Sequence, residues 1–314
     1  MSGVLFQLVQ FALILALAPA ITGLVRKVKA RLNGRIGASP LQPYRDLQRL
    51  LRKQPAAAEA ASPLFFAVPV IGLVLIWLAS GLVPTFTIDL ALAPSADLIA
   101  LAALLAAARF ATSLAGLDVG TAFGGIGASR DMMIAALAEP AMLMVIFTLS
   151  LIAGTTALPR LVHFILGGGV GVEISLSLAL IALLMIAIAE NGRIPLDNPA
   201  THLELTMVHE AMVLEYSGRH LALIEAAQMI KLLVYLSLVG AIFLPWGIAE
   251  TGTPDGVMIG LVSYLLKLAA GAAALGLFEV TIAKMRVFRA AEFLGGALLL
   301  ALLGTIFRLI AETI

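Results

Sequence analysis

Residues 63–83 read PLFFAVPVIGLVLIWLASGLV and contain no Asp, Glu, Lys, Arg or His. A helix needs roughly 20 mostly apolar residues to cross the hydrocarbon of a bilayer, and this run has that length. A helix satisfies its own backbone hydrogen bonds inside lipid. The run therefore predicts a membrane-spanning helix.

Similar runs recur along the whole chain. We expect spans at about 3–25, 63–83, 97–116, 134–156, 173–190, 222–246, 257–278 and 293–312. No stretch between them is long enough for a separate soluble domain. The predicted fold is therefore an all-α integral membrane protein with one membrane domain over residues 1–314. It has eight transmembrane helices plus a cytoplasmic amphipathic helix and ordered cytoplasmic loops.

The composition excludes whole classes of protein. Hydrophobic residues make up 61% of the 314 residues and charged residues only 12%, against about 45–50% and about 25% in soluble domains. A soluble enzyme is excluded, and so is a disordered chain, which would be poor in apolar residues. Because cysteine is absent, disulfides, zinc–thiolate sites and iron–sulfur ligation are excluded too. Any redox centre must therefore belong to another subunit.

The basic residues indicate the orientation. Fifteen of the 20 Lys and Arg residues fall in four loops on one side of the predicted bundle, at 26–62, 117–133, 191–221 and 279–292. The positive-inside rule places that side in the cytoplasm. With an even number of crossings, both termini then lie outside. We expect a multi-pass protein of a bacterial or archaeal cytoplasmic (inner) membrane, with outer loops 84–96, 157–172 and 247–256 forming turns.

Loop 26–62 contains NGRIGASPLQPYRDLQRLLRKQ from Asn33 onward. From Tyr44, three leucines share one face at helical spacing, which predicts a short amphipathic helix at the membrane surface. The helix could anchor the chain to anionic lipid, or it could clamp a cytoplasmic partner. The Gly and Pro residues between Asn33 and Pro43 favour the clamp, because simple anchoring needs no fixed turns.

Loop 191–221 continues with ENGRIPLDNPATHLELTMVHEAMVLEYSG from Glu190. Glu204 and Glu215 are eleven residues apart and would share a face of a continuous helix. Neighbouring, partly buried carboxylates hold protons more tightly, so the segment is a candidate proton store, with a solvated acidic face as the alternative. It carries three histidines, but HEAMV lacks the second His of HExxH, so we expect no metal site. From the end of the fifth span to the start of the sixth there are six acids, Glu190, Asp197, Glu204, Glu210, Glu215 and Glu225.

Four charged residues fall within predicted spans: Arg109, Glu139, Lys231 and Lys267. Two more, Glu190 and Glu279, lie at cytoplasmic span ends. Ionisable groups inside lipid are costly and are functional candidates by default. At overlapping depths they could pair along a hydrated path for protons, or they could be structural ion pairs. Glu139 and the lysines suit a relay, whereas Arg109, which effectively keeps its proton, suits a fixed charge.

The segment Glu190-Asn-Gly-Arg-Ile-Pro-Leu-Asp197, followed by Glu215-Tyr-Ser-Gly218, resembles a loop of the complex I subunit that helps to form the quinone tunnel. Leu41-Gln-Pro43 with Asp46, and Gly127-Ala-Ser-Arg130 followed by Glu139, resemble that family's other cytoplasmic motifs. The stretch 199–218 is more similar to the hydrogenase branch, the membrane subunits of formate hydrogenlyase and energy-converting [NiFe] hydrogenases. Gly34-Arg-Ile-Gly37 and a longer acidic loop depart from the complex I pattern and leave quinone binding open.

The resemblance implies a non-catalytic coupling subunit of an oxidoreductase complex. It would dock a cytoplasmic [NiFe] and iron–sulfur arm and link redox chemistry to proton or sodium translocation. The implied partners are a hydrogenase-like large subunit, iron–sulfur subunits, antiporter-like membrane subunits and the lipid bilayer, with no nucleic acid. No cofactor or metal is expected on this chain. By position, the resemblance places Glu139, Glu190, Glu204, Glu210 and Glu215 at the family's junction between its redox and proton-transfer arms. With the charged residues within or at the ends of the predicted spans, Lys231, Lys267, Glu279 and Arg109, these are the candidate relay and coupling residues. The implied docking residues are Arg35, Gln42, Pro43, Asp46, Arg130, Arg193, Asp197 and Tyr216.

Two alternatives remain. The first is a true complex I subunit that lines a quinone site. The second is a standalone secondary transporter, although no inverted repeat with paired broken spans is obvious in the sequence.

Overall fold

The structure is a computed structural model. It describes residues 2–56, 58, 61–168, 173–193, 208–250, 252–282 and 289–313. Within these ranges the chain forms helices and connecting segments, with no β-strand. The predictions for Asp197 and Glu204 lie outside the described residues.

Seven of the helices in the described part of the chain are long and apolar enough to cross a membrane. They are α1 (Ser2–Leu32), α3 (Pro63–Leu82), α4 (Leu98–Asp118), α5 (Ala122–Ala153), α10 (Gly218–Ile242), α11 (Pro254–Thr281) and α12 (Arg289–Thr313). The protein is thus a multi-pass membrane protein. The remaining predicted span, the fifth in chain order, corresponds to α7 (Ile174–Glu190), an apolar helix of 17 residues. It packs against α5, α10 and α12, so protein covers much of its surface.

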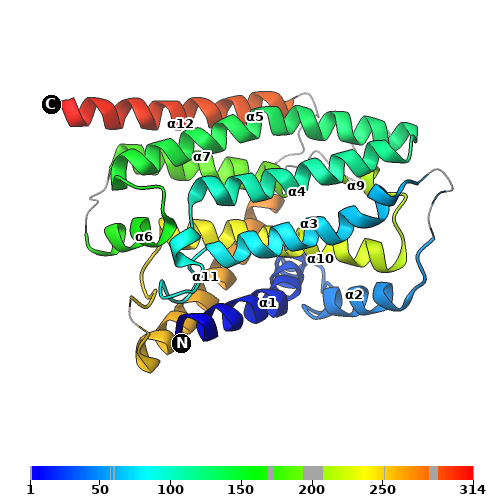
Figure 1. Cartoon of the computed structure of the whole chain (residues 1–314), viewed down its shortest axis with the longest axis horizontal. Coiled ribbons are helices and arrows are strands. Elements are labelled where there is room, and N and C mark those ends of the chain that lie inside the picture. Colours follow the sequence, from blue (N-terminus) through cyan, green and yellow to red (C-terminus); the bar gives the residue numbers. More distant parts are fainter. Residues whose placement is uncertain are drawn as a thin grey trace.

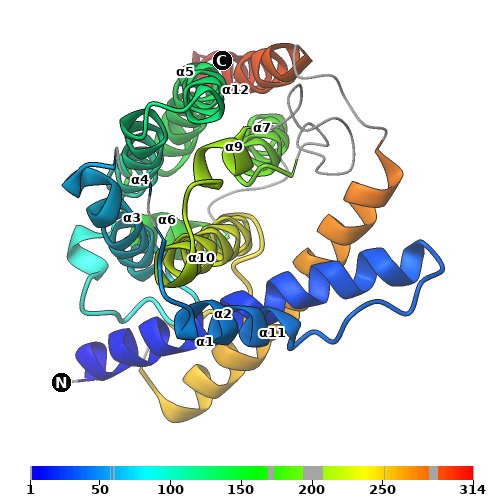
Figure 2. The same ribbon diagram turned by 90° about the vertical axis from the view of Figure 1, so that its right-hand side faces the viewer.

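The helices form one bundle with two distinct ends (Figure 1). Helices α3, α4, α5, α7, α10 and α12 run side by side, whereas α1 and α11 pack on each other and cross the bundle at an angle (Figure 2). Both chain termini and α6 (Leu158–Leu166) lie at one end. Helices α2 (Gln42–Arg52) and α9 (His209–Val213) lie at the other. The described parts of the basic loops 26–62, 117–133 and 191–221 therefore lie at one end of the molecule.

Close helix packing depends on small residues. A Cβ on Gly124 would stand 2.2 Å from the carbonyl oxygen of Gly116, so the backbones of α4 and α5 approach closely at these two residues. A Cβ on Gly260 would stand 2.1 Å from the carbonyl oxygen of Phe86. Small residues at such crossings let backbones touch, which is the main way that helices associate in lipid.

The structure differs in two places from the elements predicted from the sequence. Loop 117–133 is mostly helix, because α5 begins at Ala122, where the Thr121 hydroxyl accepts the Gly124 N–H and caps the helix. Outer loop 157–172 contains the helix α6 rather than turns alone. The predicted amphipathic helix is present as α2, two residues longer at its start than the leucine spacing indicated.

Candidate functional site: a buried charge cluster beneath a polar cavity

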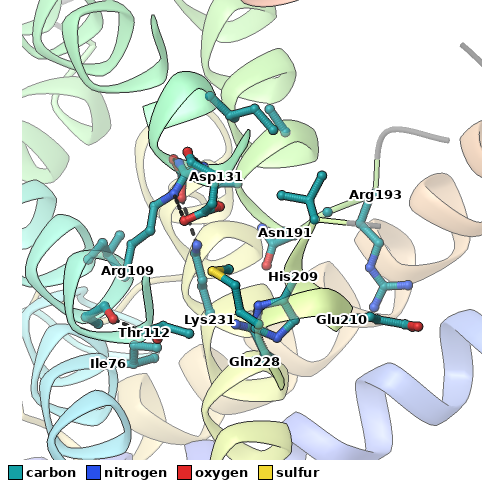
Figure 3. Close-up of a pocket in the computed structure, with 18 of the residues that line it drawn as sticks. Ile76, Arg109, Thr112, Asp131, Asn191, Arg193, His209, Glu210, Gln228 and Lys231 are labelled. Atoms are coloured by element: carbon teal, nitrogen blue, oxygen red, sulfur yellow. Dashed lines mark hydrogen bonds and ion pairs between the residues drawn. The ribbon is translucent and has the colours of Figure 1, made fainter. Parts of the chain in front are cut away.

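A cavity of about 320 Å³ opens at the end of the bundle that carries α2 and α9. Seven helices contribute to its wall, from α1 at Arg26 to α10 at Lys231. Figure 3 shows Arg109 and Asp131 on one side of this cavity, and Asn191, His209 and Arg193 on the other. The wall is rich in charge, which is unusual within a chain of this composition.

The first half of the cluster is an arginine held by an aspartate. The Arg109 guanidinium on α4 donates from Nε to Asp131 Oδ2 at 2.9 Å and from Nη2 to Asp131 Oδ1 at 2.8 Å. It also donates to the Asp131 backbone carbonyl at 2.8 Å. Ser113, one turn after Arg109, donates its hydroxyl to Asp131 Oδ2 at 2.9 Å. This two-point contact fixes the guanidinium plane as a single hydrogen bond cannot.

The second half joins a glutamate and a lysine to that arginine. Glu190, the last residue of α7, accepts from Arg109 Nη1 through Oε1. Through Oε2 it accepts from Lys231 Nζ on α10 at 2.7 Å. Its side chain is only 8% exposed, and that of Lys231 is 7% exposed. Four helices are thus connected at one point, and the two acids and two bases cancel in charge when all are ionised.

The balance of charge explains how these groups remain buried. Taking ions out of water costs several kcal/mol each, and close partners with hydrogen bonds offset that cost. Removing a single partner would leave one uncompensated charge, at a cost of about 3–5 kcal/mol. Because the cluster is neutral, a proton added to it or removed from it would leave one full uncompensated charge among these buried groups. The cluster can therefore serve as a structural pin and as a charge-sensitive element.

His209 on α9 lines the same cavity. Its pKa is lowered to about 4, mainly by burial. The Asp131 carboxylate opposes this shift, whereas Lys231 and Arg109 add to it. The imidazole is therefore neutral at physiological pH, when it can both donate and accept a hydrogen bond.

Asn191 indicates that the cavity holds water. Its Nδ2 donates to the Ala187 carbonyl at 2.7 Å, while its buried Oδ1 has no hydrogen-bond partner within the described chain. A buried acceptor without a protein donor is normally satisfied by water, and this polar cavity has room for several water molecules. No group of three or more His, Asp or Glu residues in the described ranges could hold a metal ion.

Glu279 forms a second buried ion group, near the end of α11. It accepts from Lys29 on α1 and, at 3.1 Å, from Arg193 just after α7. Its side chain is 7% exposed. The predicted coupling residue Glu279 and the predicted docking residue Arg193 are thus brought together, and they join α1, α11 and the segment that follows α7.

Glu139 does not join either group. It lies on the outward face of α5 and has no hydrogen bond or ion pair within the described part of the chain. It lines two side cavities between α4 and α5. One, of about 220 Å³, reaches Glu190 and Tyr235, and the other, of about 300 Å³, reaches Arg109. Glu139 is therefore separated from the cluster by cavities rather than by packed side chains.

The remaining predicted relay residues lie apart from the cluster. Glu210 lines the mouth of the large cavity and is exposed. Glu215 lies two residues beyond the end of α9, so the described residues 208–215 do not form one continuous helix. Whether Glu204 and Glu215 share a helix face stays a prediction, because Glu204 lies outside the described residues. Lys267 lies on α11, with neither a hydrogen bond nor an ion pair among the described residues.

The predicted docking residues divide into exposed and internal ones. Arg35 is exposed, and Arg130 is partly buried. Gln42 donates to Asp46 within α2 at 3.0 Å, and Pro43 is buried. Tyr216, which we expected to contact a partner, is instead buried within the chain. It is 4% exposed, donates its hydroxyl to the Phe65 carbonyl at 2.8 Å and stacks on the Phe65 ring, so it has almost no surface to offer a partner.

Sequence reasoning missed Asp131, Ser113 and His209 as members of the site. Asp131 falls in the predicted loop 117–133, between two apolar runs, and the glycines at 124, 125 and 127 in that stretch are poor helix formers. A useful signal was Thr121 at the helix start, since Thr is a preferred N-cap residue. It would have placed Asp131 within a helix, where a buried charge calls for a partner.

Comparison with known proteins agrees with this architecture. The family model described as NADH dehydrogenase matches residues 5–309. The chain is 33% identical to formate hydrogenlyase subunit 4 of Escherichia coli (strain K12) over 286 residues, which cover 91% of this chain and 92% of the relative. It is also 33% identical to hydrogenase-4 component C of the same organism over 264 residues, which cover 84% and 82% of the two chains.

A solved structure shares the fold at lower identity. A chain in the structure of the membrane-bound sulfane sulfur reductase (MBS), described as an archaeal respiratory membrane complex, superposes with a TM-score of 0.81 at 20% identity. The match covers 97% of this chain and 98% of that one. The family match over nearly the whole chain and the two relatives show that this protein belongs to the NADH dehydrogenase family and is similar within it to formate hydrogenlyase subunit 4 and hydrogenase-4 component C.

Proposed function

We propose that the chain is the membrane-anchor and coupling subunit of a formate hydrogenlyase-like, energy-converting hydrogenase complex. The end with α2 and α9 faces the cytoplasm in this proposal, and α7 completes eight crossings. That end docks an arm carrying [NiFe] and iron–sulfur clusters on partner subunits. The chain itself supplies no redox group, and its contribution is to bind the arm and to move charge.

The observation that supports coupling is the neutral cluster of Arg109, Asp131, Glu190 and Lys231 between two kinds of cavity. The polar cavity above it opens toward the docking end. The side cavities below it lead toward Glu139 on the outer face of α5. A change of charge at the arm would shift the balance at Glu190, and a proton could pass by way of water and Glu139 to a neighbouring membrane subunit.

The relatives favour this assignment over a quinone-site subunit of complex I. Both are subunits or components of hydrogenase systems by name, and each match covers more than four fifths of both chains. Photolabelling of the purified complex with a quinone analogue separates the two. Specific labelling of this chain that excess quinone suppresses would move the assignment to the complex I function.

Docking is tested by purifying the complex from membranes through a tag on this chain. We expect a hydrogenase-like large subunit and iron–sulfur subunits to copurify. Recovery of the tagged chain from gently solubilised membranes without any iron–sulfur protein would reject docking.

The test of coupling must distinguish the loss of a protonatable group at Glu190 from the loss of charge neutrality in the cluster. Glu190→Gln leaves the cluster with a net positive charge, so a loss of assembly in that variant would be uninformative alone. The double variant Glu190→Gln/Lys231→Met restores neutrality and places an apolar side chain where the lysine stood. We expect the double variant to assemble and to retain hydrogen evolution with an artificial electron donor, but to lose proton movement in vesicles roughly tenfold.

A matched control lies at the opposite end of the bundle. Asp255→Asn changes an exposed acid in the first turn of α11, far from the cluster, and should leave proton movement unchanged. If the Glu190→Gln/Lys231→Met variant moved protons as well as the control, the cluster would be a structural pin only.

A further inference from the structure

Lys267 is a membrane-embedded cation whose partner is not found in the described chain. It is residue 14 of the 28-residue helix α11, and at about 1.5 Å per residue it lies roughly 20 Å from either helix end. No hydrogen bond or ion pair joins it to any described residue, whereas Arg109 and Lys231 both have carboxylate partners. An ammonium ion at such depth is costly to leave unpaired.

The surroundings of Lys267 accommodate the aliphatic part of its side chain but provide no anion for its ammonium group. Its Cδ lies 3.8 Å from where a Cβ on Gly240 of α10 would stand, so Gly240 makes room for the aliphatic part of the side chain. One turn away, Tyr264 and Ser237 hydrogen-bond to each other at 2.9 Å and so satisfy one another. The ammonium group is thus positioned by α10 and α11 without an anion from either helix.

The outer surface of α11 is the least covered of the apolar helices. Only 22% of its most apolar window is buried within the chain, compared with 67% for α10. Leu265 and Leu266, which precede Lys267, are 40% and 66% exposed. This side of the molecule is therefore available to another membrane component.

Lipid is a poor partner for this charge. Long basic side chains near helix ends reach the headgroups, but a lysine near the middle of a 28-residue helix has too far to reach. A carboxylate at the same depth on a neighbouring helix would neutralise Lys267, and the four-carbon stem can adjust to it. Opposite charge and matching depth are the complementarity that the site requires.

We propose that the α11 surface around Lys267 is an interface for a transmembrane helix of another subunit that carries an Asp or Glu at mid-membrane depth. The proposal deepens the proposed function, because it assigns a membrane neighbour to a surface distant from both the docking end and Glu139. It is independent of which soluble arm the chain binds.

The charge is tested in the full complex, purified through this chain. Lys267→Glu would place two acids together, and recovery of one membrane subunit should fall about tenfold or more. Lys267→Arg keeps the charge and should retain that subunit. Asp255→Asn, which alters a charge in the first turn of the same helix and away from this surface, is the matched control and should also retain it. Unchanged recovery of every membrane subunit with Lys267→Glu would overturn the proposal.

A second measurement covers the case in which Lys267→Glu fails to fold. A photo-cross-linking residue at the exposed position Ala270 is activated in native membranes, and the adduct is identified by mass spectrometry. We expect a transmembrane peptide containing Asp or Glu, and replacing that acid by Lys should restore assembly of Lys267→Glu. Adducts with lipid alone, or with a second copy of this chain, would overturn the proposal. Loss of the soluble arm from the wild-type complex would instead count against the proposed function and leave this interface standing.

Discussion

Arg109 shows why the identity of a buried cation matters in this protein. Its guanidinium contacts Asp131 through two nitrogens and Glu190 through a third, so one side chain orients two carboxylates on two other helices. A lysine has the same charge but only one nitrogen, on a flexible stem. The geometry therefore demands arginine here, whereas Lys231 meets a single carboxylate oxygen and needs no planar group.

We accordingly predict that Arg109→Lys weakens the fold although the charge is conserved. At least one contact to Asp131 or Glu190 is lost, and a buried charged acceptor without its donor costs about 1–3 kcal/mol or more. The midpoint of thermal unfolding of the solubilised complex should fall. Lys231→Arg, which has to fit a larger group into the same cavity, serves as the reciprocal substitution. An unchanged midpoint for Arg109→Lys would show that the two-point contact is dispensable.

The shifted pKa of His209 makes the stability of the α9 contact depend on pH, and the direction of this dependence follows from the shift. Its folded-state pKa is lowered to about 4, mainly by burial and also by Lys231 and Arg109, against the opposite effect of Asp131. The unfolded value is about 6.5. Between these values the opened state binds a proton that the closed state does not. The stability of the α9 contact is therefore complete above about pH 6.5 and falls as the pH decreases toward 4, by at most about 1.4 kcal/mol per pH unit.

Hydrogen exchange of the amides in α9 measures this dependence directly. Protection, corrected for the intrinsic effect of pH on exchange, should decrease as the pH is lowered from 6.5 to 4. In His209→Gln, which retains a polar side chain but does not titrate, the slope should vanish. An equal slope in both proteins would assign the effect to another group.

At the scale of helices, the sequence predicts position better than boundary. Each of the eight apolar runs lies mostly in one helix, because long apolar runs have few other solutions in lipid. The misassigned start of α5 has a physical cause. Gly124 and Gly127 look like loop residues, yet a Cβ on Gly127 would stand 2.8 Å from the Val208 carbonyl. The glycines serve packing against neighbouring segments, and a single sequence does not reveal which segments will be neighbours.

Helix α6 was missed for a related reason. At nine residues it is too short to register as a span, and the glycines that follow it suggest a turn. Pro159 in its first turn is a common helix-start signal that could have identified it. The sequence predicts some members of the charge cluster but not how they pair. Depth alone brings Arg109, Glu190 and Lys231 into consideration, but their pairing depends on how the helices are rotated.

Adjacent glycines at the start of α5 provide a paired test of helix packing. Gly124→Ala places a methyl group 2.2 Å from the Gly116 carbonyl oxygen, so α4 and α5 must separate, at a cost of about 1–3 kcal/mol. Gly125→Ala meets nothing within 4 Å and should be neutral or slightly stabilising, since alanine favours helix. Thermal unfolding of the two purified variants compares them. Equal midpoints would show that the α4–α5 contact does not govern stability.

At the scale of the whole molecule, the two ends of the bundle have different characters. One end holds both termini and short connections, and the other gathers α2, α9, the polar cavity and most of the basic residues (Figure 1). Residues 31–39 at this second end are all exposed, and Ile36 is 78% exposed. Ile36 is therefore a suitable probe position, because a partner docked on this end would cover it.

The absence of cysteine allows orientation and docking to be tested together. We predict that Ile36→Cys resists an impermeant maleimide in intact cells, because the basic end faces the cytoplasm, whereas Asp255→Cys at the opposite end reacts. In inverted vesicles that retain the soluble arm, Ile36→Cys should still be protected, because the arm covers it. Removing the arm with a chaotrope should raise its labelling several-fold while Asp255→Cys stays inaccessible. Labelling of Ile36→Cys in intact cells would reverse the orientation, and equal labelling before and after removal of the arm would place the docking surface elsewhere.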